Sequence, residues 1–238
     1  MRTAYTVFRN LYNVRKMTMK LVLASGSQRR RELLTMCGYD YEIIVSNADE
    51  TIDENDPESF VRALSFRKAK DVFDRLFAAG RRDFAVIGSD TVVAFQKEGE
   101  TKPVIIGKPK DAKDAVRILS MLSGKTHRVF TGVSVIADIP DENAAAQCSI
   151  QEKAEIQTEC SITEVTFETL SPDEITDYVN SGDPLDKAGS YGIQGPFGMF
   201  VREIRGNYFT VIGMPIPVLY KMLKKIGILP HGFYERIE

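Results

Sequence analysis

The sequence is poor in the side chains that build metal centres, disulfide frameworks and histidine-based catalytic triads. Its 238 residues include only three cysteines, Cys37, Cys148 and Cys160, and none of them belongs to a C-x-x-C pair. This spacing predicts neither a disulfide framework nor a zinc site, and it favours a reducing cytoplasm as the compartment. The only histidines are His127 and His231. We expect His127 to be a half-exposed strand residue and not a catalyst.

Long apolar runs and a strong excess of one charge are also missing. No apolar segment approaches the length of a membrane span, so no membrane partner is expected. The formal net charge of -2 gives no overall reason to expect binding to nucleic acid. Any basic site must therefore be local.

The first 20 residues contain five basic side chains and no acidic one. Because they lack a long apolar segment, they do not fit a secretory signal. They weakly resemble a mitochondrial presequence, but we favour a flexible leader or a start of translation at Met17 or Met19. The sequence leaves the choice among these open.

Apolar runs alternate with helical periodicities along most of the chain. The runs predict strands at residues 21–24, 41–45, 85–88, 91–95, 129–137, 161–168, 200–204 and 209–212. The periodicities predict helices at residues 30–37, 57–79, 111–122, from 171 onward and 217–226. A polar stretch at 140–158 is the best candidate for a loop or hairpin tip. The alternation indicates an α/β fold with a mixed sheet.

A cluster of small hydroxyl and basic residues lies where the first strand gives way to a helix. Residues 25–31 read Ser-Gly-Ser-Gln-Arg-Arg-Arg. A helix N-terminus offers free backbone N–H groups and a partial positive charge. Serine, glycine and arginine at that point suit a phosphate chain, although a solvated helix start with a serine N-cap explains the segment equally well.

An acidic residue interrupts the apolar run 85–94. Asp90 within Gly-Ser-Asp-Thr either caps a bend or presents a carboxylate at the edge of the sheet, and we favour the second because Gly88 permits close backbone approach. Glu50 lies in an acidic pair directly after the second strand. Together Glu50 and Asp90 could bind Mg²⁺, which prefers a few carboxylates plus substrate phosphates.

Other polar residues are weaker candidates when taken singly. Lys68 lies on or beside the apolar stripe of the helix 57–79, from where it either extends to solvent or points into a cleft. Lys108 lies in a Gly-Lys-Pro turn. Residues 123–126 imitate the end of a P-loop, but Leu119 replaces the required glycine and the order of helix and strand is reversed. The glycine-rich run 183–195, which carries Gln194, suggests a loop against a ligand.

Several unlinked segments together resemble one family, the Maf-type nucleoside triphosphate pyrophosphatases. They are Leu-Ala-Ser-Gly-Ser-Gln-Arg-Arg-Arg-Glu-Leu-Leu, Asp-Glu at 49–50, Arg-Lys-Ala at 67–69, Gly-Ser-Asp-Thr-Val-Val, Gly-Lys-Pro, Leu-Ser-Gly-Lys-Thr-His, Thr-Gly-Val and Asp-Lys-Ala-Gly-Ser-Tyr-Gly-Ile-Gln-Gly. The resemblance runs from about residue 20 to residue 229. It implies an elongated mixed sheet flanked by helices, with two lobes and a cleft between them as in Maf and ITPase-like proteins.

The resemblance implies cleavage of a nucleoside triphosphate to the monophosphate and pyrophosphate. The Tyr-Gly-Ile-Gln-Gly ending resembles the subgroup that acts on dTTP and UTP. Asp90 falls on the family's proton acceptor, with Glu50 and Lys68 beside it as catalytic residues. Substrate-binding roles are expected for Ser25, Ser27, Arg29, Arg30, Thr91, Lys108, Lys187 and Gln194, of which Arg29, Thr91 and Gln194 match positions tied to substrate choice.

The same resemblance sets expectations for cofactor and organisation. A divalent cation, Mg²⁺ or Mn²⁺, is expected on Glu50 and Asp90, and a homodimer is admitted by the resemblance alone. We expect a basic leader at 1–19, a single Maf-like catalytic domain at 20–230 and a C-terminal tail at 231–238. Gln28 replaces the usual proline of the first motif. The rival readings are another base preference, such as 7-methyl-GTP, and a non-hydrolytic nucleotide-binding regulator of septum formation.

Overall fold

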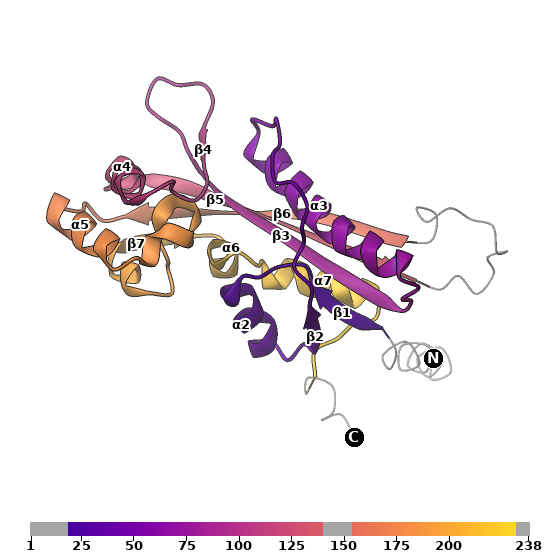
Figure 1. Ribbon diagram of the computed structural model, residues 1–238. Helices are drawn as coiled ribbons and strands as arrows, with labels where there is room; N and C mark the ends of the chain where they lie inside the picture. The colour runs from indigo at the N-terminus through magenta and orange to yellow at the C-terminus, as the bar shows by residue number, and fades with distance from the viewer. Residues whose placement is uncertain (1–18, 140–153, 232–238) are drawn as a thin grey trace, which may run out of the picture.

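A seven-stranded mixed sheet forms the centre of the protein in the computed structural model, which describes residues 19–139 and 154–231 (Figure 1). Six strands follow the order β2-β1-β3-β5-β6-β7, and β4 pairs with β3 as well. β1 pairs in parallel with β2 and β3, and the other pairs are antiparallel, which confirms the predicted mixed sheet. The strands are β1 (Lys20–Leu23), β2 (Tyr41–Ile43), β3 (Phe84–Phe95), β4 (Val104–Ile106), β5 (Thr126–Asp138), β6 (Ala154–Phe167) and β7 (Val201–Arg205).

Helices cover both faces and both ends of the sheet (Figure 1). Two of them begin at the predicted helix starts, residues 111 and 171: the Asp111 carboxylate accepts from the backbone N–H of Asp114, and Ser171 and Glu174 form a complete capping box. The α-helices are α2 (Gln28–Met36), α3 (Pro57–Ala78), α4 (Ala112–Leu122), α5 (Pro172–Asn180), α6 (Tyr208–Ile212) and α7 (Ile216–Lys225). Three short 3₁₀ helices are η2 (Asp183–Asp186), η3 (Ala188–Ser190) and η4 (Pro196–Phe200).

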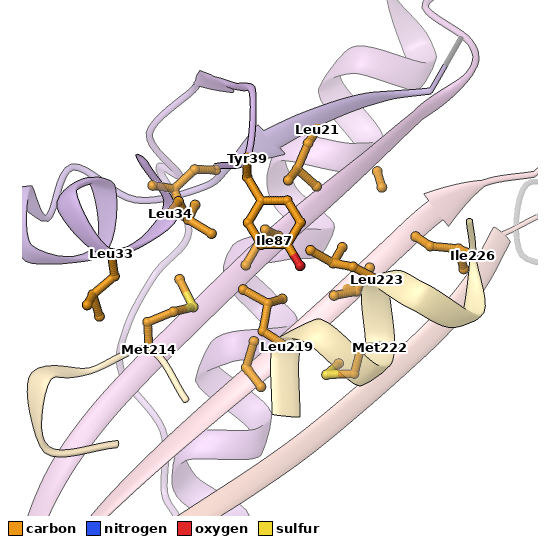
Figure 2. Close-up of a cluster of buried hydrophobic side chains, with 14 of the residues drawn as sticks. Leu21, Leu33, Leu34, Tyr39, Ile87, Met214, Leu219, Met222, Leu223 and Ile226 are labelled. Carbon is orange, nitrogen blue, oxygen red and sulfur yellow. The ribbon is translucent and has the colours of Figure 1, made fainter. Parts of the chain in front are cut away.

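The long strands β3, β5 and β6 connect two lobes, each with its own apolar core. At one end Leu33, Ile87 and Leu219 belong to a core made by β1, α2 and α7 against the sheet (Figure 2). At the other end Leu119 and Phe167 belong to a core made by α4, α5, β6 and the segment after α5. The helix α3 packs along one face of the long strands through a third cluster. The two-lobed α/β architecture expected from the sequence is therefore confirmed.

The structure corrects four local predictions. The run 85–95 is not broken at its polar residues but forms one continuous strand, β3. Residues 209–212 form a helix and not a strand, because Asn207 caps it and Gly213 ends it in a left-handed conformation. The first helix begins at Gln28, two residues earlier than predicted. Of the predicted loop 140–158, residues 154–158 belong to β6, and residues 140–153 lie outside the described part.

The predicted leader and tail lie almost wholly outside the described residues, which begin at Met19 and end at His231. No helix within residues 19–139 and 154–231 is both long enough and apolar enough to cross a membrane.

Candidate active site

A gap beside β3 opens the cleft between the two lobes. β1 pairs with residues 84–87 of β3 and β4 pairs with residues 93–95, while β5 pairs along the other side from 85 to 94. Within the described residues, the segment 88–92 therefore has no strand beside it on the side away from β5. The cleft there has a volume of about 1630 Å³. The prediction that Asp90 lies at a sheet edge therefore holds for this segment, although β3 is an interior strand along the rest of its length.

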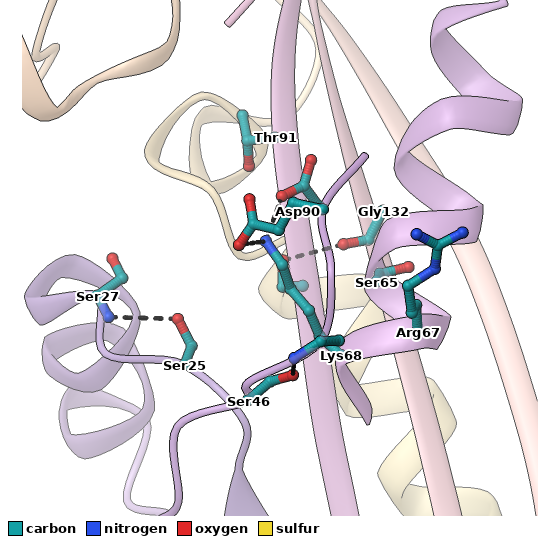
Figure 3. Close-up of polar contacts among 12 residues, drawn as sticks. Ser25, Ser27, Ser46, Ser65, Arg67, Lys68, Asp90, Thr91 and Gly132 are labelled. Carbon is teal, nitrogen blue, oxygen red and sulfur yellow. Dashed lines mark hydrogen bonds and ion pairs between the residues drawn. The ribbon is translucent and has the colours of Figure 1, made fainter. Parts of the chain in front are cut away.

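Asp90 projects from this segment toward α3 and meets an ammonium group. The Lys68 Nζ lies 2.7 Å from Asp90 Oδ1 and 3.0 Å from Glu50 Oε1 (Figure 3). The Lys68 and Asp90 side chains are each 12% exposed, whereas Glu50 is 65% exposed at the mouth of the cleft. Three residues from three separate segments thus converge on one point, as the sequence predicted.

Two glycines bring α3 close enough for this contact. A Cβ on Gly88 would lie 2.1 Å from the Ser65 carbonyl oxygen, and one on Gly132 would lie 2.1 Å from the Val61 carbonyl oxygen. The helix backbone therefore rests directly on β3 and β5. Lys68 lies one turn after Ser65, and Asp90 lies on the same strand face as Gly88. The predicted close approach at Gly88 is confirmed.

The serines of the first motif, Ser25 and Ser27, lie at the start of α2 and line the cleft. The backbone N–H of Ser27 donates to Ser25 Oγ at 3.2 Å (Figure 3). Ser27 occupies the N-cap position, but its side chain makes no capping hydrogen bond. The hydroxyl is thus not used by the helix, which agrees better with a ligand-facing role than with the alternative of a simple serine cap.

The consecutive arginines point in different directions. Arg30 turns inward: its Nε donates to the Gly213 carbonyl at 2.8 Å, Nη1 to Ser25 Oγ at 3.1 Å and Nη2 to Thr91 Oγ1 at 3.4 Å. Burial lowers the pKa of Arg30, and the charge of Asp90 partly opposes this. Arg30 therefore ties together three separate segments of chain around the site. Arg29 instead extends across the cleft, where its Nη1 lies 3.3 Å from Asp186 Oδ2.

Thr91 faces away from Asp90, since successive side chains of a strand alternate. Its hydroxyl lies 3.0 Å from that of Thr131, which donates to the Thr210 carbonyl at 2.7 Å. Lys108 and Gln194 are exposed residues of the cleft lining, and no hydrogen bond or ion pair engages either side chain within the described part of the chain. Both are therefore available to a ligand.

Lys187 is bound by its own loop. Its Nζ donates to the Asp183 carbonyl at 2.6 Å and lies 2.9 Å from Asp183 Oδ1 and 2.8 Å from Asp186 Oδ1. Asp183 also accepts from Tyr178, whose hydroxyl accepts from the Gly192 backbone. Partial burial tends to raise the pKa of Asp186, but Lys187 and Arg29 outweigh it and the pKa is lowered.

The sequence reasoning missed three contributors to this site. Asp183 and Asp186 lie in the same glycine-rich run as the predicted residues Lys187 and Gln194 but are not among the predicted site residues. His127 is 2% exposed, which corrects the predicted half-exposed position. Its Nε2 lies 3.0 Å from the hydroxyl of Tyr191, a residue of the cleft lining, and its ring packs edge-on against Phe167. A single histidine within a strand-forming segment carries no signal in the sequence for such burial.

The carboxylates of Glu50 and Asp90 form a donor set that fits a hard divalent cation. Both line the cleft and contact the same ammonium group, that of Lys68, and carboxylate oxygen is the ligand that Mg²⁺ prefers. Within the described residues no group of three or more His, Cys, Asp and Glu side chains forms a complete metal centre. Such a pair suits an ion that takes its remaining ligands from water and from phosphate oxygens.

The fold and the cleft define an α/β protein with a charged site between two lobes, suited to a polyanionic ligand. Comparison with known proteins agrees: the chain belongs to the family described as Maf-like protein, which matches residues 20–226. It is 39% identical over 217 residues to the dTTP/UTP pyrophosphatase of Agathobacter rectalis, covering 88% of this chain and 98% of the relative. The dTTP/UTP pyrophosphatase of Bacillus thuringiensis subsp. konkukian is 42% identical over 210 residues, covering 88% and 96%.

A solved structure of the Ham1 protein of Staphylococcus aureus shows a weaker likeness. It has 15% identity and a TM-score of 0.43, over 87% of this chain and 98% of that one. At this level the comparison supports no statement about function.

Proposed function

We propose that the protein is a nucleoside triphosphate pyrophosphatase that hydrolyses dTTP and UTP to the monophosphate and pyrophosphate. The observation that carries the proposal is the convergence of Asp90, Lys68 and Glu50 in a cleft that also holds the start of α2. Relatives that share about 40% of the sequence over most of the chain carry that name. The site contains the groups that such a reaction requires.

The reaction needs a base, a clamp for the phosphate chain and a counter-charge for the leaving group. Asp90 accepts the proton of a water molecule whose oxygen attacks the α-phosphorus, and the bond to the bridging oxygen of the pyrophosphate breaks. Lys68 holds the two carboxylates in place and contributes a positive charge. The free N–H groups of α2 bind phosphate oxygens, and Arg29 engages them bidentately.

Glu50 and Asp90 are the residues that would hold Mg²⁺ or Mn²⁺. The cation, when bound, neutralises charge on the leaving pyrophosphate. Lys108 and Gln194 also line the cleft. Lys108 supplies a further positive charge, and Gln194 offers an amide that can pair with the base edge. We also propose the cytoplasm as the compartment, because Cys37 and Cys160 are free thiols.

A substrate panel tests the proposal. Purified protein is incubated with dTTP, UTP, CTP, GTP and 7-methyl-GTP, each with Mg²⁺ and with Mn²⁺, and pyrophosphate release is measured. We expect dTTP and UTP to be the best substrates. Turnover in heavy-oxygen water should place the label in the monophosphate, because the attack is on the α-phosphorus.

The matched variants are Asp90→Asn and Asp177→Asn, which remove one carboxylate inside and one outside the cleft. Asp177 is exposed on α5 and does not line the cleft. We expect Asp90→Asn to abolish turnover while circular dichroism shows the fold intact, and Asp177→Asn to behave as wild type. Normal activity of Asp90→Asn would refute the assignment. Nucleotide binding without turnover in any metal would favour the regulator.

A further inference from the structure

The ion pair between Arg29 and Asp186 crosses the cleft and joins the two lobes. Arg29 lies at the start of α2, and Asp186 ends η2 in the other lobe. The Asp186 carboxylate bridges two cations, with Oδ2 at 3.3 Å from Arg29 Nη1 and Oδ1 at 2.8 Å from Lys187 Nζ. All three residues line the cleft. A carboxylate therefore lies among the cations that a phosphate chain would meet.

The three partners are held unequally. Lys187 is only 13% exposed and keeps two further contacts to Asp183, so it stays fixed without Asp186. Asp186 is 69% exposed and Arg29 is 30% exposed, and their contact is long and made through one of the five N–H donors of arginine. Such an exposed, single-point pair is weak. The Asp186 side chain can rotate into solvent without disturbing the loop that Lys187 and Asp183 hold together.

A phosphate group makes stronger contacts with the same partner. A phosphate oxygen and a carboxylate oxygen accept the same charge-assisted hydrogen bonds, but a phosphate group offers more oxygens and more charge, and it binds arginine bidentately. A carboxylate that stays beside the phosphate chain would also repel it. The exposed position of Asp186 and the single contact with Arg29 both favour exchange over a permanent pair.

We propose that Asp186 is an internal counter-anion that competes with the phosphate chain of the substrate for Arg29. This inference rests on the proposed function and extends it: Asp186 weakens the binding of polyphosphates and so limits how tightly the product pyrophosphate is held. Asp186 thereby raises KM and favours product release, whereas Asp90 and Lys68 act on the chemical step.

Binding of inorganic pyrophosphate and tripolyphosphate to Asp186→Asn is the direct test, since it requires no turnover. Isothermal titration should show binding about two- to fivefold tighter than wild type at low salt, in keeping with the small worth of exposed pairs. The gain should shrink at about 0.5 M salt, where exposed charges are screened. KM for UTP should fall by a similar factor, and kcat should not rise. Asp177→Asn, which removes a charge elsewhere on the same lobe, should show no gain.

The role of Arg29 is tested by a double variant. If Asp186 acts by occupying Arg29, the gain should vanish when Asp186→Asn is combined with Arg29→Gln. Asp186→Ser removes the same charge with a smaller side chain and must give the same gain in affinity. This second variant keeps the test decisive if one of the two fails to fold. Pyrophosphate binding that is unchanged or weaker in both folded variants would overturn the inference and indicate that Asp186 positions Arg29. Absence of turnover in the substrate panel would refute the proposed function, but the binding test would still decide whether Asp186 competes for Arg29.

Discussion

The ammonium group of Lys68 lies 2.7 Å from the carboxylate of Asp90, although the two residues are 22 positions apart and belong to different layers of the fold. The contact exists because α3 rests on β3 without an intervening side chain at Gly88. A buried ion pair adds little net stability by itself. Both residues line the cleft, as the catalytic role proposed for them requires.

Replacement of Lys68 by methionine should separate this role from stability. The methionine side chain would fill the volume of the lysine methylene groups but leave the Asp90 carboxylate without the positive charge of the Lys68 ammonium group. We expect kcat to fall on the order of a hundredfold or more, with pyrophosphate release from UTP as the measurement. Lys70→Met is the matched control, because Lys70 pairs with Asp74 on the exposed side of the same helix. Comparable activity of the two variants would contradict the assignment.

Alanine at Gly88 or Gly132 should move α3 away from the sheet. The new Cβ would meet the backbone oxygen of Ser65 or Val61 at 2.1 Å, and backbone cannot give way as a flexible side chain can. We expect destabilisation of about 1–3 kcal/mol, typical of overpacking, measured by urea unfolding. We also expect a loss of kcat beyond the loss of folded protein, because Lys68 moves with the helix.

Gly107→Ala is the control for both alanine variants. A Cβ at Gly107 meets no atom within 4 Å, and its backbone is not in the left-handed region. Its stability should therefore equal that of wild type. Gly88→Ala and Gly132→Ala variants as stable as Gly107→Ala would contradict the inference that α3 packs through its backbone directly on β3 and β5.

Local signals in the sequence were sufficient for most of the elements. Caps such as Asp111 and the box of Ser171 and Glu174 act within one turn, so their residues alone identify the helix starts. The prediction of a strand at 209–212 is wrong because the aromatic and β-branched residues of this run favour strands. The residues that cap the helix, Asn207 and Gly213, lie just outside the run. Caps overruled side-chain propensity there.

The convergence at the site was predictable only through the motifs. Asp90, Lys68 and Glu50 could be expected to meet because the motifs occur together, but no local pattern shows that Gly88 receives the backbone of Ser65. Long-range contacts also explain why adjacent arginines differ. Arg30 donates a hydrogen bond to the carbonyl of Gly213, which lies 183 positions away, and Arg29 forms an ion pair with Asp186 in the other lobe.

Arg30 should matter more for stability than Arg29. Its side chain bonds the Gly213 carbonyl and the Ser25 and Thr91 hydroxyls, and lysine cannot reproduce this fork. We expect Arg30→Lys to destabilise the fold by about 1–3 kcal/mol through partners left unsatisfied, measured by urea unfolding. Arg29→Lys should change stability by no more than about 0.5 kcal/mol, since it removes one exposed contact. The reverse order would show that the three hydrogen bonds of Arg30 do not stabilise the fold.

His127 should make the fold sensitive to acid. Burial lowers its pKa from 6.5 to about 3, because the imidazolium has no access to water between Phe167 and Tyr191. The unfolded chain takes up a proton below about pH 6.5, whereas the folded protein does not until about pH 3. Stability therefore falls as the pH drops through this window, by about 1.4 kcal/mol for each pH unit at most.

His127→Gln removes the titrating group and keeps an amide that can reach the Tyr191 hydroxyl. Urea midpoints measured from about pH 7 to about pH 4.5, within the window in which only the unfolded chain is protonated, should decline less steeply in this variant than in wild type. His127→Gln nevertheless starts from a lower stability at neutral pH. The decline that both proteins share comes from carboxylates that are stabilised in the folded state, such as Glu174, whose pKa is lowered by the Ser171 backbone. Parallel pH profiles of the two proteins would mean that the His127 ring reaches solvent readily and contributes nothing to acid sensitivity.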